Sequence, residues 1–442
     1  MIPVLKFVPT ARAGWLFVAA SALFLVSAPA ALAVDLLVAL FIVLDARRSS
    51  LADIERTAPR SVPLGGTGLV DLRVRAKSRR TVQMSITDDI DTRLTRSGPP
   101  VDRAGDDWER GVRVSVRPGV TTHVRYGVRA AVRGIMRLGD IHARVDGPWA
   151  LASRRVVIPA AATMRVVPEY ASGLRRRGHP LHRTLRQIGP RRTIRRGEGR
   201  EFESLRDYVR GDDPRFIDWK SSARRGNRVV RSYEAERSQN LVLAFDAGRH
   251  MRESVAGRER ADLALSAGMT MARRAELYGD RVGWMVFDQQ IRQVAPPRRV
   301  SLGPLAETLA AVETRLVEPN YPLAFAQLSR AFRKRSLVVL FCDIIDSRVS
   351  GALVESMSRL AGYHLPLAVA IQNPDLEQVA SAPVDSERAA YRRAAAVELR
   401  QARTTALEGM RRAGILVVDT QPGEALIRTL EKYAEVKERG LL

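Results

Sequence analysis

Four aspartates stand at or near the ends of apolar segments in the C-terminal half of the chain, and their carboxylates could do chemistry there. They are Asp246, Asp288, Asp343 and Asp419. In an open parallel sheet, ligands bind beyond the carboxyl ends of the strands. Asp246 and Asp343 could therefore converge on one site, and two carboxylates would favour a divalent cation, Mg²⁺ or Mn²⁺. The same spacing is equally compatible with aspartates that cap the helices after the strands.

A second concentration of charged side chains lies between residues 199 and 224, around the strong turn Gly211-Asp212-Asp213-Pro214. Its carboxylates lie close enough in sequence for acid–base chemistry to be considered. Because Arg and Asp or Glu alternate with apolar and aromatic residues, we favour a packed, salt-bridged structural motif docked on a neighbouring domain. The residues that characterise this signature segment are Arg200, Glu201, Arg206, Asp207, Tyr208, Gly211, Asp212, Asp213, Arg215, Asp218, Trp219 and Arg224.

Sequence motifs for nucleotide or nucleophilic chemistry are absent. Gly197-Glu198-Gly199 lacks the Gly-Lys-Ser/Thr of a phosphate-binding loop, and no dinucleotide fingerprint follows a strand. The single cysteine, Cys342, ends the apolar run Leu337–Cys342 and reads as a buried strand residue. His179 and His182 have no cysteine or close carboxylate to complete a metal site. No catalytic residue and no firm cofactor is therefore predicted, and the protein is expected not to be an enzyme.

The region that must position the four aspartates, residues 237–442, has the pattern of an α/β domain. Apolar runs alternate with amphipathic stretches, and the clearest helix covers about Ser386–Ala413, with Gly414 ending it. This alternation predicts a doubly wound parallel sheet with helices on both faces. The predicted strands are Leu241–Phe245, Val282–Phe287, Leu337–Cys342, Leu365–Ala370 and Ile415–Val418.

Two regions precede this domain. Residues 52–170 contain short stretches of period-two alternation, such as Gly68–Val74 and Ile141–Val145, which predict a β-rich, sandwich-like domain. Residues 171–236 form a connector that begins with a basic stretch and continues as the signature segment. The expected architecture is therefore multidomain.

The N-terminal region is expected to attach the chain to a membrane. Residues 14–44 are almost wholly apolar, broken by Pro29 and Asp35. One continuous helix of that length would measure roughly 46 Å, too long for a hydrocarbon core of about 30 Å. Pro29 therefore suggests a hairpin of two short spans within residues 14–48, after a cytoplasmic segment at residues 1–13.

Basic residues flank this apolar region on both sides: Lys6 and Arg12 before it, Arg47 and Arg48 after it. The positive-inside rule then places both ends in the cytoplasm. A cleavable signal peptide ending at Ala31-Leu32-Ala33 is the alternative, although the apolar run resumes directly afterwards.

The signature segment closely resembles that of the bacterial "domain of unknown function 58" family. The match runs from about Arg200 to Glu236 and includes Gly226–Glu234. The resemblance extends to the order of parts: membrane hairpin, β-rich region, signature, then a von Willebrand factor A-like domain. It implies work with a MoxR-type AAA+ ATPase in the assembly or maturation of other proteins.

The resemblance also implies a degenerate metal-ion-dependent adhesion site. Von Willebrand A domains use Asp-x-Ser-x-Ser after the first strand, whereas this chain has Asp246-Ala247-Gly248-Arg249-His250. The second aspartate is kept as Asp343, but Asn320-Tyr321-Pro322 lacks the usual threonine, and Arg249 adds a competing positive charge. We expect such a domain to bind its partner without a cation.

The formal net charge of +24 reflects 72 basic residues, most of them Arg, spread along 442 residues. We interpret most of them as solvated surface residues.

The first functional hypothesis is an adaptor in the bacterial inner membrane, with its soluble domains in the cytoplasm. The alternative is a polyanion-binding protein, for nucleic acid or anionic lipid, acting through Arg175–Arg196. Nucleic acid is the less expected partner, because no nucleic-acid-binding fold is recognisable. A hydrolase built on the carboxylates at 201–218 is least favoured, since no activated nucleophile accompanies them.

Overall fold

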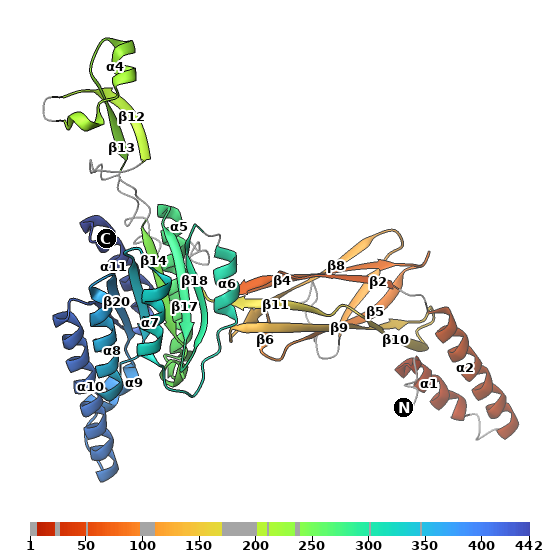
Figure 1. Cartoon of the computed structure of the whole chain (residues 1–442). Helices are drawn as coiled ribbons and strands as arrows, with labels where there is room; N and C mark the ends of the chain where they lie inside the picture. The colour runs from red at the N-terminus through yellow and green to blue at the C-terminus, as the bar shows by residue number, and fades with distance from the viewer. Residues whose placement is uncertain are drawn as a thin grey trace. The chain divides into compact units, whose positions relative to one another are not determined.

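The computed structural model describes residues 7–22, 27–49, 52–97, 111–169, 201–209, 212–234, 239–299, 302–344 and 347–442. The chain forms two compact units, Met1–Val167 and Pro168–Leu442 (Figure 1). The basic stretch with its two histidines, Arg200 and Gly211 lie outside the described residues.

The first unit begins with two helices that pack side by side, α1 (Ala11–Ser21) and α2 (Ala28–Arg48) (Figure 1). Only α2 is long and apolar enough, among the described helices, to cross a membrane, and a signal sequence would meet the same criteria. The prediction that Pro29 lies in the turn between two short spans is wrong. Pro29 lies in the first turn of α2, where a backbone N–H would have no partner within the helix, so proline is tolerated there.

The rest of the first unit is β-structure in two sheets around one apolar core. One sheet has the order β2-β4-β8-β6. In the other, the long strand β9 pairs with β5 on one side and with β10 and β11 on the other. The strands are β1 (Phe7–Pro9), β2 (Ala52–Thr57), β3 (Ser61–Pro63), β4 (Thr67–Ala76), β5 (Val82–Ile90), β6 (Leu94–Ser97), β7 (Val112–Val116), β8 (Thr121–Ala130), β9 (Gly134–Asp146), β10 (Ala152–Ile158) and β11 (Ala162–Val167).

Alternation explains how these strands build a core. In β4, Val70, Leu72 and Val74 are buried, whereas Arg73 between them and Arg75 after them are exposed, because successive side chains point to opposite faces of a sheet. The sheet-rich region predicted from period-two patterning is therefore confirmed.

One buried polar contact ties the two sheets together. Arg56 of β2 pairs with Asp88 of β5 at 2.5 Å, and the hydroxyl of Tyr126 from β8 donates to the same carboxylate. Burial acts to raise the pKa of Asp88, so the contacts to it compensate for the loss of water.

The second unit contains a six-stranded sheet of order β18-β17-β14-β19-β20-β21, in which only the edge strand β18 is antiparallel. Helices cover both faces, with α5, α6 and α11 over one core and α7, α8 and α10 over the other (Figure 1). The chain is thus multidomain, with an α/β part as predicted. The strands are β14 (Asn240–Asp246), β17 (Arg281–Phe287), β18 (Ile291–Arg298), β19 (Leu337–Cys342), β20 (Leu365–Ile371) and β21 (Leu416–Thr420). The helices are α5 (Arg260–Tyr278), α6 (Leu302–Ala310), α7 (Tyr321–Ala331), α8 (Ser347–Ala361), α9 (Pro374–Ser381), α10 (Glu387–Arg412) and α11 (Ala425–Arg439).

The signature segment forms a small substructure of its own. Strands β12 (Glu201–Asp207) and β13 (Val229–Glu234) pair antiparallel, and the chain between them holds a 3₁₀ turn, η3 (Pro214–Phe216), and a short helix, α4 (Trp219–Arg225).

Candidate carboxylate site

The four strand-end aspartates lie along the carboxyl edge of the α/β sheet, as predicted from their spacing. Asp246 ends the central strand β14, whose neighbours are β17, followed by Asp288, and β19, followed by Asp343. Asp419 lies near the end of the edge strand β21. We refer to these four residues together as the carboxyl-edge aspartates.

Asp246 is buried, and both of its carboxylate oxygens accept a hydrogen bond. One of its oxygens accepts the backbone N–H of Gly248 at 2.7 Å, and the other accepts the hydroxyl of Tyr321 at 2.8 Å. Burial raises the pKa of Asp246 to about 7, with these two hydrogen bonds opposing the rise and the negative charge of Asp343 adding to it. Gly248 fits closely here, because a Cβ atom on it would lie 2.9 Å from the carbonyl oxygen of Val317.

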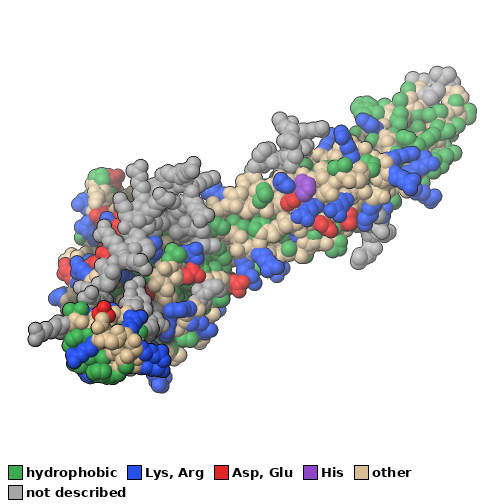
Figure 2. All heavy atoms as spheres, turned by 90° about the horizontal axis from the view of Figure 1, so that it is seen from above, with side chains coloured by type: hydrophobic (Ala, Val, Ile, Leu, Met, Phe, Trp, Pro, Cys, Tyr) green, Lys and Arg blue, Asp and Glu red, His purple; other side chains and the backbone are tan. Residues whose placement is uncertain are grey.

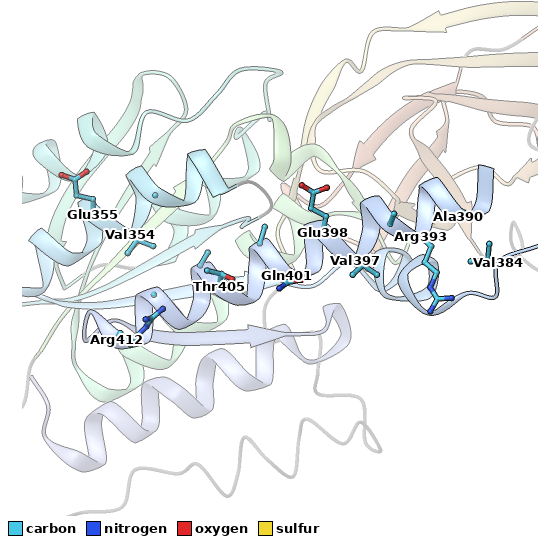
Figure 3. Close-up of a pocket in the computed structure, with 15 residues that line it drawn as sticks. Val354, Glu355, Val384, Ala390, Arg393, Val397, Glu398, Gln401, Thr405 and Arg412 are labelled. Carbon is cyan, nitrogen blue, oxygen red and sulfur yellow. The ribbon is translucent and has the colours of Figure 1, made fainter. Parts of the chain in front are cut away.

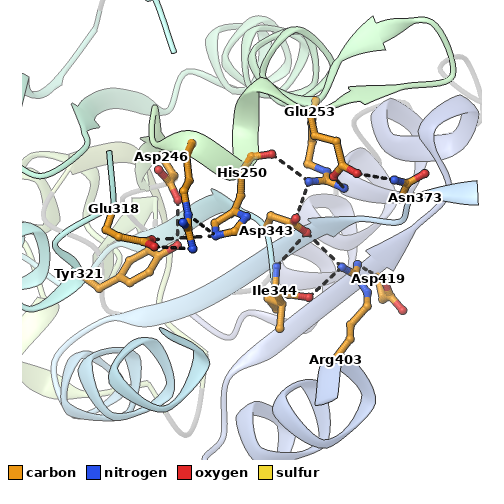
Figure 4. Close-up of polar contacts among 12 residues, drawn as sticks. Asp246, His250, Glu253, Glu318, Tyr321, Asp343, Ile344, Asn373, Arg403 and Asp419 are labelled. Atoms are coloured by element: carbon orange, nitrogen blue, oxygen red, sulfur yellow. Dashed lines mark hydrogen bonds and ion pairs between the residues drawn. The ribbon is translucent and has the colours of Figure 1, made fainter. Parts of the chain in front are cut away.

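Asp343 is held by two arginines (Figure 4). The guanidinium of Arg260, from the first turn of α5, contacts one oxygen, and that of Arg403, from α10, lies 3.2 Å from the other. The backbone N–H of Ile344 donates to the latter oxygen at 2.9 Å. Burial raises the pKa of Asp343, and the positive charges of Arg260 and Arg403 act against that rise.

Both arginines are fixed by further contacts. Arg260, whose side chain is 1% exposed, also pairs with Glu253 at 2.7 Å and donates to the carbonyl oxygen of His250 at 2.9 Å. Arg403 pairs with Asp419 at 2.7 Å. The result is a continuous charged network from Glu253 to Asp419 across the carboxyl edge (Figure 4).

Three further contacts lie at this edge. Asp288 accepts Nε of Arg292 at 2.8 Å and the backbone N–H of Gln290 at 2.9 Å. Burial acts to raise the pKa of Asp288, but these bonds hold it below its ordinary value. Arg249 pairs with Glu318 at 2.6 Å, and both side chains are about half exposed. Asp343 is therefore neutralised by Arg260 and Arg403, whereas Arg249, which was expected to add a competing positive charge, pairs with Glu318.

A divalent cation does not fit between Asp246 and Asp343 as they stand. The guanidinium groups of Arg260 and Arg403 hold positive charge against the oxygens of Asp343 that a metal would need, and each oxygen of Asp246 already accepts a hydrogen bond. Across the described ranges, no group of three or more His, Cys, Asp and Glu side chains is placed to hold a metal ion. The capping interpretation does not fit Asp246 either, because the 3₁₀ turn after it, η4 (Arg249–Arg252), has Gly248 at its N-cap.

The sequence reasoning missed the two arginines that organise this edge and the role of Tyr321. Arg260 and Arg403 lie in helices far from Asp343 along the chain, and only the packing of α5 and α10 brings them to β19. Tyr321 lies in the segment where the resemblance implied a threonine. Its hydroxyl group was the sequence feature from which the contact with Asp246 could have been predicted.

The signature residues serve structural contacts. Arg206 forms a two-pronged pair with Asp212, both N–O distances being 2.6 Å. Asp213 accepts the backbone N–H of Arg215 and pairs with its guanidinium at 2.7 Å. Asp218 caps α4 by accepting the backbone N–H of Ser221 at 2.9 Å.

Other signature residues are less constrained. The backbone N–H of Tyr208 donates to the carbonyl oxygen of Arg228 at 2.8 Å, and the carbonyl oxygen of Asp207 accepts from Arg206. Trp219 is 68% exposed and Arg224 is exposed, so the expectation of a packed aromatic does not hold for Trp219 within the described part of the chain. Glu201 lies at the start of β12.

A groove of about 1130 Å³ runs between α8 and α10, and none of the carboxyl-edge aspartates lines it (Figure 3). Most of its lining side chains are small or apolar, such as Val354, Ala394 and Val397. The groove presents no nucleophile–base pair.

Known proteins offer distant similarities. Over 184 residues the chain is 26% identical to uncharacterized proteins of Mycobacterium bovis and Mycobacterium tuberculosis. The match covers 40% of this chain and 56% of each relative, so the chain spans little more than half their length.

Solved structures add little. A FixG-related protein from Vibrio parahaemolyticus matches 26% of this chain and 95% of its own at 11% identity, with a TM-score of 0.18. The alpha-2-macroglobulin of Escherichia coli matches 28% of this chain and 17% of its own at 20% identity, with a TM-score of 0.19.

The family comparison agrees with the signature segment. Residues 204–418, which run from β12 to β21, match the family described as "Protein of unknown function DUF58".

Proposed function

We propose that this protein is a membrane-anchored, non-enzymatic adaptor whose α/β domain resembles a von Willebrand factor A domain and binds other proteins. The observation that carries the proposal is the state of the carboxyl-edge aspartates. All four are bonded within the domain, to Gly248 and Tyr321, to Arg292, and to Arg260 and Arg403. At the edge where such a sheet would bind and transform a small substrate, the carboxylates are thus engaged in internal hydrogen bonds and ion pairs, which favours a binding surface.

The sheet supports the von Willebrand A comparison. A mixed sheet with one antiparallel edge strand and helices on both faces is the architecture expected for such a domain. Asp246 and Asp343 occupy the ends of adjacent strands β14 and β19, as the two aspartates of a metal-ion-dependent adhesion site would. In this copy the arginines supply the positive charge, so partner binding is metal-independent.

The exposed pair beside this edge is the candidate contact. Arg249 and Glu318 are about half exposed, and Arg249 also donates to the ring of His250 at 3.1 Å. They follow strand β14 and precede helix α7, at the same edge as the aspartates. The proposed partner, by the family resemblance, is a MoxR-type AAA+ ATPase. Membrane attachment through α2, with the soluble units in the cytoplasm, completes the proposal.

The test is affinity purification of the full chain from native membranes, followed by mass spectrometry. The test variant is Arg249→Ala/Glu318→Ala. The matched control is Arg428→Ala/Glu424→Ala, an exposed ion pair between α11 and its N-cap residue Glu424, with an N–O distance of 3.1 Å. Both purifications are washed at low and high salt, with and without EDTA.

We expect an AAA+ ATPase to be recovered with wild type and control at high salt and in EDTA, and to be lost with the test variant. Recovery of nucleic acid alone, released by salt, would refute the adaptor proposal and favour polyanion binding. Loss of the ATPase in EDTA would refute the metal-independent contact.

A further inference from the structure

Within the first unit, helix α2 is held firmly against the turn between β9 and β10. Asp45, near the C-terminus of α2, is completely buried, and its carboxylate accepts the backbone N–H groups of Trp149, Leu151 and Ala152 at 2.8–2.9 Å. A Cβ atom on Gly147 would lie 2.4 Å from this carboxylate, so only glycine fits. The turn between β9 and β10 is therefore fixed at the level of Asp45 along the axis of α2.

This height corresponds to the surface of a bilayer. The 21 residues of α2 span about 32 Å, close to a hydrocarbon core of about 30 Å, and Arg47 and Arg48 end the helix. The ring of Trp149 lies 5.3 Å from the guanidinium of Arg48 and 5.6 Å from the ring of Phe41, which precedes Arg48 by two turns of α2. Trp149, which is 41% exposed, thus lies at the level of the membrane–water interface, where tryptophans are enriched.

The strand registers bring two more turns to this end. Ala52, which begins β2 shortly after α2, pairs with Ala76 at the end of β4, and Ala76 bridges to Pro118. The turns at residues 77–81 and 117–120 therefore lie at the same end as the turn with Trp149. Figure 2 shows basic side chains beside the apolar helices of this unit. The exposed basic residues of these turns and of the end of α2 are Arg47, Arg48, Lys77, Arg79, Arg80 and Arg117.

We propose that this end of the first unit rests on the bilayer, with Trp149 in the interfacial layer and the six basic side chains facing anionic lipid headgroups. The inference rests on the proposed anchoring by α2. Each basic residue at an anionic surface strengthens binding about fivefold. The contact would fix the first unit upright on the membrane, and not merely tether it.

The test places an environment-sensitive fluorophore on a cysteine at the membrane turn. The variant Pro148→Cys provides an exposed site beside Trp149, while the native Cys342 is buried and unreactive. The control, Val132→Cys, lies in the exposed turn between β8 and β9 at the other end of the unit. The full chain is reconstituted into vesicles of phosphatidylcholine with and without phosphatidylglycerol.

We expect the emission of the Pro148→Cys probe to shift to the blue and to be quenched by headgroup-labelled nitroxide lipid, more strongly with phosphatidylglycerol. The Val132→Cys probe should report water throughout. Water-like emission at both sites in protein that floats with the vesicles would overturn the contact while leaving the anchoring intact. Failure to float would instead refute the anchoring.

Charge variants test the headgroup contact separately. Arg79→Gln/Arg80→Gln/Arg117→Gln should abolish the effect of phosphatidylglycerol on the Pro148→Cys probe. Arg60→Gln/Arg129→Gln/Arg137→Gln removes the same charge from exposed positions toward the other end and should leave it unchanged. An equal loss in both would show a general charge effect and overturn the assignment of these turns.

Discussion

Arg260 and Asp343 form an ion pair in which neither side chain reaches solvent, their exposed fractions being 1% and 0%. Arg260 is the first residue of α5 and Asp343 directly follows β19, so the pair joins the start of one helix to the carboxyl edge of the sheet. A buried carboxylate needs a compensating positive charge, and here an arginine of the same chain provides it.

Substitution Arg260→Ala should destabilise the α/β domain strongly. Removing one partner leaves the other charge buried, which typically costs about 3–5 kcal/mol. We expect amide hydrogen exchange in β19 to accelerate by roughly two to four orders of magnitude. The control Arg273→Ala, on the same helix and paired with Glu276 at the surface, should cost about 1 kcal/mol or less. Equal effects of the two variants would contradict the role given to Arg260.

The same substitution should create sensitivity to metal. In the wild type, neither Mn²⁺ nor EDTA should change the melting temperature, because the oxygens of Asp343 form ion pairs with Arg260 and Arg403. In Arg260→Ala, Asp343 and Glu253 each lose a guanidinium contact, so Mn²⁺ should raise the melting temperature. Calorimetric titration with Mn²⁺ measures both proteins, and tight binding to the wild type that Asp343→Asn removes would refute the closed site.

Asp246 should make the domain less stable as the pH rises. Its pKa is about 7 in the folded state and close to 4 in the unfolded chain, so the folded state binds more protons between these values. The free energy of unfolding should fall across this window by at most roughly 4 kcal/mol, at about 1.4 kcal/mol per pH unit, and level off above pH 7.

Two substitutions isolate this effect. Asp246→Asn should lose this part of the pH dependence, measured as the difference from wild type in denaturant unfolding between pH 4 and 8. Tyr321→Phe removes a hydrogen bond that favours the ionised carboxylate, so the decline should extend to higher pH. A wild-type curve parallel to that of Asp246→Asn would show that Asp246 does not titrate in this range.

Local patterning accounted for much of the α/β domain. Continuous apolar runs marked five of its strands, and α10 lies at Glu387–Arg412 with Ser386 as its N-cap, close to the predicted helix. The strand β18 was not predicted, because Pro296 and Pro297 argue against a strand interior. At an antiparallel sheet edge prolines are tolerated, since one side of the strand needs no partner.

The carboxyl edge shows where local patterning ends. The positions of Asp246 and Asp343 follow from strand ends, which are local features of the sequence. Their partners do not, because Arg260 and Arg403 become partners only when α5 and α10 pack against the sheet. In a chain with so many arginines, no sequence feature distinguishes these two from those exposed to solvent.

The contact between α2 and the turn that joins β9 and β10 should depend on Asp45. In Asp45→Ala, the three backbone N–H groups of Trp149, Leu151 and Ala152 lose a charged acceptor, and such bonds contribute about 1.5–3 kcal/mol each. We expect amide hydrogen exchange at these residues, in detergent or nanodiscs, to accelerate at least about tenfold.

Two further variants serve as controls. Asp45→Asn keeps one carbonyl oxygen as an acceptor, so its exchange rate should fall between those of the wild type and Asp45→Ala. Asp53→Ala removes an exposed carboxylate of the same unit, which lies 4.0 Å from Lys77, and should leave the turn protected. Unchanged protection in Asp45→Ala would mean that β1 and its pairing with β10 hold the turn without α2.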